Sequence, residues 1–516
     1  MPIESSDIQL LKYLQENHDV PLTGAAADFY RNPSSLRRQI ASINLELGSL
    51  CQISICNGRI CSRLTYQDYL DIIQSLSMET YVPSCKERMQ LIIVEAFFKD
   101  TVNLSRLYET LDFSVTTKKS DTARLRPLLF AYGQTIQVVK KKGIRITGDE
   151  LRLRMLLIEI LLPLIEWEPA AGMTKRHANT PIQSVMADAC IHSSLSPAQL
   201  EARFPSLFLK IRDYHLSYQS RKLLSLYLCL SASRQAAHPV TATGQVLLEP
   251  PHWDMLDDSL ENRALLHMIS MMDFDPGPRL PVNAALFGHA IRLSDAAQRL
   301  SGICFTEKER VHEELYRYLY KIYFQDFYGI QIKDKMVRNT ERQFPVLYQA
   351  ICNELIPASQ EFGIRFQAEH YTTLTLILQK WIHYCQLAGQ NRKAIVLVTN
   401  TSSERSGFFI SALEDLVEFR LSAIISIHEL ELLQKLSYDY IITLSDRTAD
   451  MLAGQGYPSL RLEFFLGTED LGKLLAAGFD TARKRLPAKT IADSLDGLPS
   501  GEIAKQLKRD YPEHFI

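Results

Sequence analysis

One pattern occurs twice within the first 150 residues, and it restricts the fold more than any other feature of the chain. In each occurrence two segments with helical periodicity lead to a third segment with a basic front. Two short apolar segments then flank a glycine turn. The third segments begin at Pro33 and Thr116, and the turn glycines are Gly58 and Gly143. Each occurrence is therefore predicted to be three short helices followed by a β-hairpin.

The second occurrence is the clearer one. Helices are expected over residues 86–99 and 104–111, followed by a turn over 112–115 and a third helix that Thr116 or Thr117 can cap. The side chains expected to face inward from this third helix are Val115, Thr122, Leu125 and Leu129. The side chains expected to point outward are Lys118, Lys119, Arg124 and Arg126.

A basic turn follows this third helix. Residues 135–139 and 144–149 are predicted strands, and Lys140, Lys141 and Lys142 lie in the turn between them. A short second helix, a tight turn and a polar-fronted third helix form the helix-turn-helix plan, in which the third helix enters the DNA major groove. The hairpin is then a wing whose lysines can reach phosphate.

The first occurrence has the same layout. Helices are expected over residues 8–14, 22–29 and 33–40. The exposed front of the third helix consists of Ser35, Arg37 and Arg38. Residues 53–55 and 59–63 flank an Asn-Gly turn, which is typical of a hairpin. The alternative is that both copies are ordinary three-helix units with solvated basic side chains, but two copies that each carry a wing favour DNA binding.

Beyond residue 150 the pattern of hydrophobic residues changes once. Helical periodicity continues to about residue 385, interrupted by a loop-like stretch over residues 236–253. After residue 390, strands are expected over residues 394–398, 422–427 and 440–444, with a helix over 408–419. Strands that alternate with helices form a parallel sheet. The expected fold class is therefore mainly α and multidomain, with a C-terminal α/β unit.

Composition limits the function. The net charge is −2 and the pI is about 6.7, so a DNA-binding footprint has to be local. The nine cysteines have no zinc-ligand spacing and are expected to be reduced thiols of a cytoplasmic protein. No signal peptide is expected, and the most apolar stretch, residues 155–165, is too short to span a membrane. Because no HExxH, GxSxG or Walker motif is present, we expect no catalytic residues, metal or cofactor and hence no enzyme.

Two phrases of the second occurrence match a known family. Thr117, Asp121 and Leu125 fit a recognition-helix pattern of Ser/Thr, Asp and Leu, and residues 141–148 fit the wing phrase Lys-Lys-Gly-Tyr-Arg-Ile-x-Gly except at Ile144. This unit resembles the winged helix-turn-helix of bacterial transcription regulators that carry phosphotransferase-system regulation domains (PRDs). The first occurrence is similar to the Mga-type helix-turn-helix that precedes it in the virulence regulators Mga and AtxA.

The resemblance implies a domain arrangement for the whole chain. The implied parts are winged units at 1–68 and 69–155, PRD-like helical bundles at 156–300 and 301–388, an enzyme IIB-like α/β domain at 391–485, and an unassigned tail at 486–516. It also implies a homodimer that binds double-stranded DNA and activates transcription, with phosphotransferase-system phosphocarrier proteins as further partners.

The positions that carry phosphate in this family are altered here. The histidine positions of the PRD phrases hold Tyr227, Glu314 and Ile377, and the cysteine position of the IIB-like domain holds Thr399. Glu314 is expected to be a solvated residue on a helix face. The histidines nearest to these positions are out of register and are expected to be surface or capping residues, namely His215, His312 and His370. The phosphorylation sites are therefore predicted to be degenerate.

The loop that follows Thr399 is expected to be structural. Glu404 within it would repel phosphate, although Ser402, Ser403 and Arg405 could bind another anion. Two other functions remain open. An RNA-binding antiterminator would need a small β-rich N-terminal domain, whereas this N-terminus is predicted to be helical. A phosphotransfer component would need a cysteine or histidine at the altered positions.

Overall fold

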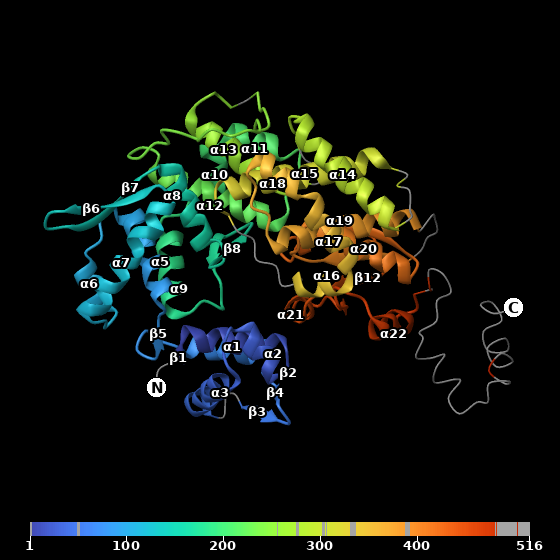
Figure 1. The fold of residues 1–516 in the computed structure, drawn as a ribbon, viewed down its shortest axis with the longest axis horizontal. Helices are drawn as coiled ribbons and strands as arrows, with labels where there is room; N and C mark the ends of the chain where they lie inside the picture. The colour runs from blue at the N-terminus through green and yellow to red at the C-terminus, as the bar shows by residue number, and fades with distance from the viewer. Residues whose placement is uncertain are drawn as a thin grey trace.

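The computed structural model describes most of the chain. The described residues are 3–48, 52–254, 256–274, 278–301, 305, 307–330, 337–386, 393–479, 481 and 503. All but residue 503 of the expected tail at 486–516 lies outside them. The structure is mainly helical with several small sheets, which confirms the predicted fold class (Figure 1). None of the described helices is both long enough and apolar enough to cross a membrane.

The first winged unit has the three predicted helices and the predicted hairpin, together with a strand between the first two helices that was not predicted. Its helices are α1 (Ser5–Glu16), α2 (Leu22–Asp28) and α3 (Pro33–Leu47), and α3 continues seven residues beyond its predicted end at residue 40. Strands β2 (Asp19–Pro21), β3 (Ile53–Cys56) and β4 (Arg59–Ser62) form an antiparallel sheet in the order β2-β4-β3. Asn57 and Gly58 both have positive φ, as the tight turn between β3 and β4 requires.

Two short elements join this unit to the next. Helix α4 (Tyr66–Ser75) is capped by Thr65, whose side chain accepts a hydrogen bond from the amide of Asp68. Strand β5 (Tyr81–Val82) then pairs in parallel with β1 (Ile3–Glu4). The beginning of the chain is thereby attached to the segment that leads into the second winged unit.

The second winged unit consists of three helices and a hairpin. The helices are α5 (Cys85–Lys99), α6 (Leu104–Thr110) and α7 (Val115–Ala131), and the antiparallel strands are β6 (Gln134–Val139) and β7 (Gly143–Gly148). Figure 1 shows this hairpin projecting from one end of the molecule.

The start of α7 differs from the prediction. Ser114, and not Thr116 or Thr117, caps the helix, since its hydroxyl accepts a hydrogen bond from the amide of Thr117 at 3.1 Å. Val115 is therefore the first helical residue, and it is 61% exposed although it was expected to face inward. Leu125 and Leu129 are buried as predicted.

Helices continue from the wing to the middle of the chain, with one hairpin that was not predicted. Helix α8 (Glu150–Leu161) ends before the hairpin of β8 (Ile165–Glu168) and β9 (Gly172–Lys175), which lies in the region where helical periodicity was expected to continue. The following helices are α9 (Pro181–His192), α10 (Pro197–Arg203), α11 (Pro205–Ile211), α12 (Tyr218–Arg234) and α13 (Leu260–Ser270). Residues 235–254 contain no helix or strand, in line with the predicted loop.

A second group of helices follows. It comprises α14 (Ala284–Ser301), α15 (Lys308–Phe327), α16 (Val337–Gln343), α17 (Pro345–Glu354), α18 (Ile356–Phe362) and α19 (Ala368–Gln386). Helix α14 packs chiefly on α15, α17 and α19. By its contacts α14 thus belongs with the helices after residue 301, although it was expected in the bundle of residues 156–300.

The C-terminal unit is a four-stranded parallel sheet in the order β11-β10-β12-β13. Its strands are β10 (Lys393–Val398), β11 (Phe419–Ile425), β12 (Tyr440–Thr443) and β13 (Leu460–Arg461). Its helices are α20 (Ser403–Leu416), the 3-10 helix η2 (Leu430–Lys435), α21 (Asp446–Gly454) and α22 (Thr468–Ala476). Helix α20 begins five residues earlier than predicted, directly after the β10 loop.

One continuous apolar core runs from Ile3 in β1 to Ile382 in α19. The parallel sheet has separate apolar clusters on its faces, and Leu376 of α19 packs in one of them. Both winged units are therefore built onto the helical body through buried side chains.

Candidate nucleic-acid interface

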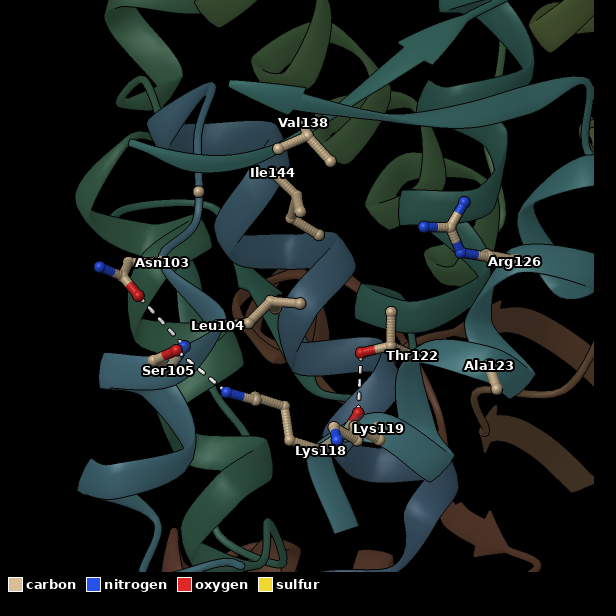
Figure 2. Close-up of a pocket in the computed structure, with 11 residues that line it drawn as sticks. Asn103, Leu104, Ser105, Lys118, Lys119, Thr122, Ala123, Arg126, Val138 and Ile144 are labelled. Atoms are coloured by element: carbon tan, nitrogen blue, oxygen red, sulfur yellow. Dashed lines mark hydrogen bonds between the residues drawn. The ribbon is translucent and has the colours of Figure 1, made fainter. Parts of the chain in front are cut away.

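A groove lies between α6, α7 and the wing of the second unit. Its volume is about 620 Å³. Figure 2 shows the residues around it, which are Asn103, Leu104, Ser105, Lys118, Lys119, Thr122, Ala123, Arg126, Val138, Gly143 and Ile144. The groove thus combines three cations with apolar side chains, and it lies between α7 and the hairpin of β6 and β7.

Helix α7 supplies the cations of the groove. Lys118 is held in place because its Nζ donates a hydrogen bond to the hydroxyl of Ser105 at 3.0 Å, while Lys119 and Arg126 are exposed (Figure 2). Arg124 is also exposed, but it lies outside the groove, with one guanidinium nitrogen 3.8 Å from the sulfur of Cys85. Three of the four predicted cations therefore line one groove, and Arg124 lies beside α5.

The wing carries three exposed lysines, Lys140, Lys141 and Lys142, at its turn. Gly143 ends this turn with a φ of +117°. A Cβ atom at Gly143 would lie 2.1 Å from the carbonyl oxygen of Val102, so only glycine fits there. The glycine of the basic phrase thus allows the wing to lie against the segment between α5 and α6.

A buried ion pair seats α7 on the other two helices. Asp121 is 2% exposed and accepts hydrogen bonds from Arg88 Nε at 2.6 Å and Nη2 at 3.1 Å. The hydroxyl of Tyr108 donates a third bond at 2.7 Å. Burial alone would raise the pKa of Asp121, but the bonds from Arg88 and Tyr108 hold it below its usual value. One carboxylate on α7 therefore connects α5 on one side with α6 on the other.

The sequence identified only part of this cluster. Asp121 was noted as a residue of the recognition-helix pattern, but Arg88 and Tyr108 were not recognised as its partners. Arg88 is a buried cation on a helix that is otherwise apolar on this side, next to Leu91 and Ile92. A charged residue inside an apolar stripe requires a buried partner, and this was the available signal.

The first unit also presents a basic front. Arg37 and Arg38 on α3 are exposed, and the amide of half-buried Ser35 donates to the side chain of Asn32, which caps the helix. The unit is joined to the later helices by an ion pair between Asp28 on α2 and Arg338 on α16. The front of α3 thus remains free while α2 is attached to the body.

The four altered phosphorylation positions lie apart from this interface. Tyr227 and Ile377 are completely buried within α12 and α19. Thr399 follows β10, and its hydroxyl lies 3.1 Å from that of Thr401. Glu314 is not a solvated residue as expected, because it accepts hydrogen bonds from Lys380 Nζ at 2.6 Å and Trp381 Nε1 at 2.7 Å. Its partners on α19 are too distant in sequence for helical periodicity to indicate them.

The three out-of-register histidines differ from one another. His370 is a capping residue as predicted, since its Nδ1 accepts a hydrogen bond from the amide of Gln367. Burial lowers the pKa of His370 to about 4, so it is neutral at pH 7. His215 is about half exposed and lies 3.7 Å from Glu429. His312 is half-buried with its ring edge against Phe287.

The β10 loop has its own buried charge. Glu404 was expected to repel phosphate at this loop, but its carboxylate is buried and accepts a hydrogen bond from Lys321 on α15 at 3.0 Å. The ammonium group of Lys321 lowers the pKa of Glu404, although burial opposes this. Among the residues that the structure describes, no group of three or more His, Cys, Asp or Glu side chains could hold a metal ion.

Comparison with known proteins agrees with this geometry. Residues 74–161 match the family model of the Mga helix-turn-helix domain, a stretch that runs from the end of α4 through α5, α6, α7 and the wing to the end of α8. No curated protein matches the chain.

These residues form a winged helix-turn-helix, the domain with which DNA-binding transcription regulators contact their operators. More particularly, their sequence is similar to that of the Mga helix-turn-helix domain. From the sequence alone, the first unit was likened to the Mga-type helix-turn-helix, whereas the family model matches the second unit.

We expect the Asp121 cluster to be the structural anchor of this interface. Asp121→Ala would leave Arg88 buried without its main partner, which typically costs about 3–5 kcal/mol. The measurement is the urea midpoint of unfolding by circular dichroism. The matched control is Lys119→Ala on the same helix, which should change stability by less than about 0.5 kcal/mol because Lys119 is exposed. Equal midpoints for both variants would show that the ion pair does not seat α7.

Proposed function

We propose that this protein is a cytoplasmic, sequence-specific DNA-binding transcription regulator that acts as an activator. The supporting observation is the charge on α7, whose sole carboxylate, Asp121, is buried and paired. The exposed charges on α7 are then all positive, and the wing lysines add to them. A chain with a net charge of −2 thus concentrates cations where a helix-turn-helix contacts DNA.

The residues divide into two roles under this proposal. Lys140, Lys141 and Lys142 on the wing contact phosphates, while the front of α7 reads base edges in the major groove. The base-reading set on α7 consists of Thr117, Lys118, Lys119, Arg124 and Arg126. In the first unit, Ser35, Arg37 and Arg38 make a second set of contacts, so that one chain covers a longer stretch of DNA.

Substitution of these cations tests the proposal. Alanine at Lys140, Lys141 or Lys142 should weaken binding to all sequences and reduce the salt slope by about 0.9 per lost phosphate contact. Alanine at Arg126 should cost about 1–3 kcal/mol and relax the preference at one base position. Gel-shift titrations at several salt concentrations measure both effects.

A control and a decisive variant complete the experiment. Lys435→Ala removes an exposed lysine of the α/β unit and should leave binding unchanged. The quadruple replacement of the four α7 cations by alanine should abolish specific binding. If it binds the operator as tightly as the native chain does, α7 is not the reading helix.

We also propose that the protein acts as a homodimer. A single reading helix specifies a short site, and two helices related by a twofold axis raise both the affinity and the length of the site. Sedimentation velocity of the full chain at micromolar concentration should give the mass of two chains. A species of 58.9 kDa at these concentrations would contradict the proposal.

The alternative functions have less support. An RNA-binding antiterminator would need a β-rich N-terminal domain, and residues 3–48 are mostly α1, α2 and α3. A phosphotransfer component would need a nucleophile at the altered positions, where Tyr227 and Ile377 are buried and Glu314 is paired with Lys380. Thr399 is a poor substitute for a cysteine because a hydroxyl requires an activating base.

Phosphotransfer can be tested directly, with phosphocarrier proteins as donors. Incubation with phosphoenolpyruvate, enzyme I and the histidine phosphocarrier protein should produce no acid-labile phosphate on this chain. An authentic PRD protein in the same reaction serves as the positive control. Stoichiometric labelling that is lost on replacing His215, His312 or His370 would instead show that the helical region is a live phosphorylation sensor.

A further inference from the structure

The connection between α5 and α6 contains a strained turn. Asp100 has φ +62° and ψ −34°, and the amide of Thr101 donates a hydrogen bond to the carbonyl of Lys99 at 2.7 Å. A bond between residues i and i+2 around a central residue of positive φ is a classic γ-turn, which is rare and strained for any residue with a Cβ atom. Such a turn persists only where its surroundings hold it in place.

The wing holds this turn from one side. Val102 pairs with Ile144 of β7 through two backbone hydrogen bonds of 2.8 and 2.9 Å. Arg145, the next residue of β7, donates a hydrogen bond to the carboxylate of Asp100. The turn and the wing are therefore joined by both backbone and side-chain contacts.

The helical body holds the turn from the other side. The imidazole Nε2 of His238 lies 3.6 Å from the carboxylate of Asp100. Arg234, the last residue of α12, donates to the carbonyl of Phe97 at 2.8 Å, and its guanidinium lies 4.6 Å from the centre of the Phe97 ring. Residues 234–238, which we term the strap, thus contact the end of α5 and the strained turn directly.

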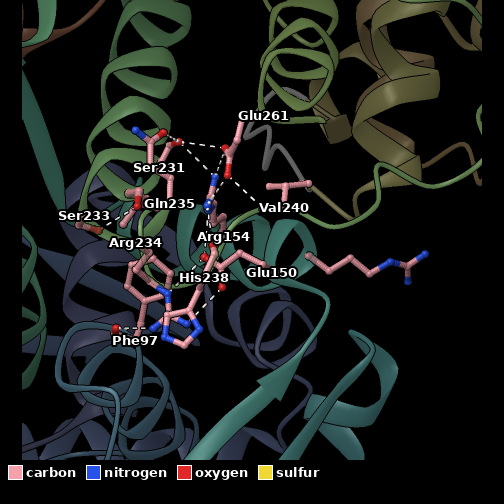
Figure 3. A network of polar contacts seen from close by, with 12 residues as sticks. Phe97, Glu150, Arg154, Ser231, Ser233, Arg234, Gln235, His238, Val240 and Glu261 are labelled. Carbon is pink, nitrogen blue, oxygen red and sulfur yellow. Dashed lines mark hydrogen bonds and ion pairs between the residues drawn. The ribbon is translucent and has the colours of Figure 1, made fainter. Parts of the chain in front are cut away.

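The strap is itself fixed by a buried network, shown in Figure 3. Arg154 on α8 donates to the carbonyl of His238 at 3.2 Å and to both oxygens of Glu261 on α13, at 2.7 and 3.0 Å. Glu150 on α8 accepts hydrogen bonds from both Arg154 and Arg234. The position of the strap therefore depends on how α8, α12 and α13 are packed together.

We propose that the strap is the element through which the helical body sets the position of the wing. A change in the packing of α12 against α13 moves His238, and this releases or tightens the turn at Asp100 and with it β7. DNA affinity then responds to the state of the helical body without any substitution at the DNA-contacting face. This last step rests on the proposed DNA-binding function, whereas the coupling of strap to wing does not.

Hydrogen–deuterium exchange on the full DNA-free chain tests the coupling. His238→Ala removes the contact with Asp100 at a partly exposed site, and Asp100→Asn removes the charge while keeping a residue that tolerates positive φ. Each should raise amide exchange in residues 134–148 several-fold, without changing exchange in α12 or α13. The matched control is His252→Ala, an exposed histidine of the same loop, which should leave the wing unchanged.

The outcomes separate the two ideas. Unchanged exchange in the wing of both variants would overturn the coupling, and so would a uniform rise throughout the chain, because that indicates loss of stability only. In parallel gel shifts, His238→Ala should weaken DNA binding about 3-fold to 10-fold for all sequences. If the exchange changes but the affinity does not, the regulatory step is wrong. If the native chain binds no DNA while the exchange result holds, the proposed function fails and the coupling stands.

Discussion

The burial of Arg154 constrains how the parts of this chain are assembled. Its side chain is completely enclosed, and the charge is tolerated there because Glu150 on the same helix and Glu261 on α13 both accept hydrogen bonds from it. Loss of one partner of a buried pair typically costs about 3–5 kcal/mol, whereas replacing a whole pair by apolar residues is often neutral. The network thus contributes more to the relative orientation of the helices than to stability, since a guanidinium donates hydrogen bonds only along its fixed N–H bonds. It fixes the orientation of α8, which follows the wing, relative to α12 and α13.

The same reasoning applies in the second winged unit, at Asp121. This residue is the sole carboxylate of α7, and it points inward, where it accepts hydrogen bonds from Arg88 and Tyr108. An aspartate on the outer face would have reduced the attraction of the helix for phosphate. Because Asp121 lies underneath, one residue both anchors α7 and leaves the exposed charges of this helix all positive. A neutral overall composition is therefore compatible with strong local attraction.

Local patterns predicted most of the helices and hairpins, and they failed at some element boundaries and where the deciding contact came from elsewhere in the chain. Both hairpins were predictable, because an Asn-Gly turn and a glycine turn between short apolar segments strongly favour a hairpin. The α8 to β8 boundary was missed because apolar residues follow one another there without a break in periodicity. Glu314 was expected in solvent as a glutamate on a helix face, whereas its partner Lys380 lies on another helix. In the candidate interface, sequence predicted which cations α7 carries but not that Arg124 lies outside the groove, beside Cys85.

The C-terminal sheet contacts the helical body at one end of its strands, through the loop that follows β10. In open parallel sheets, ligands bind at the carboxyl ends of the strands, next to the point where the strand order reverses. Here β10 is followed at that edge by Thr399 and Thr401, whose hydroxyls bond to each other, and Thr401 also reaches the hydroxyl of Ser406. The first turn of α20, which would face an anion, instead directs Glu404 to the buried ammonium group of Lys321 on α15. A carboxylate at a helix N-terminus satisfies the same dipole that would otherwise attract a phosphate. The hydroxyl groups at this edge are therefore bonded to one another, and the ion pair between Glu404 and Lys321 fastens the sheet to the helical body.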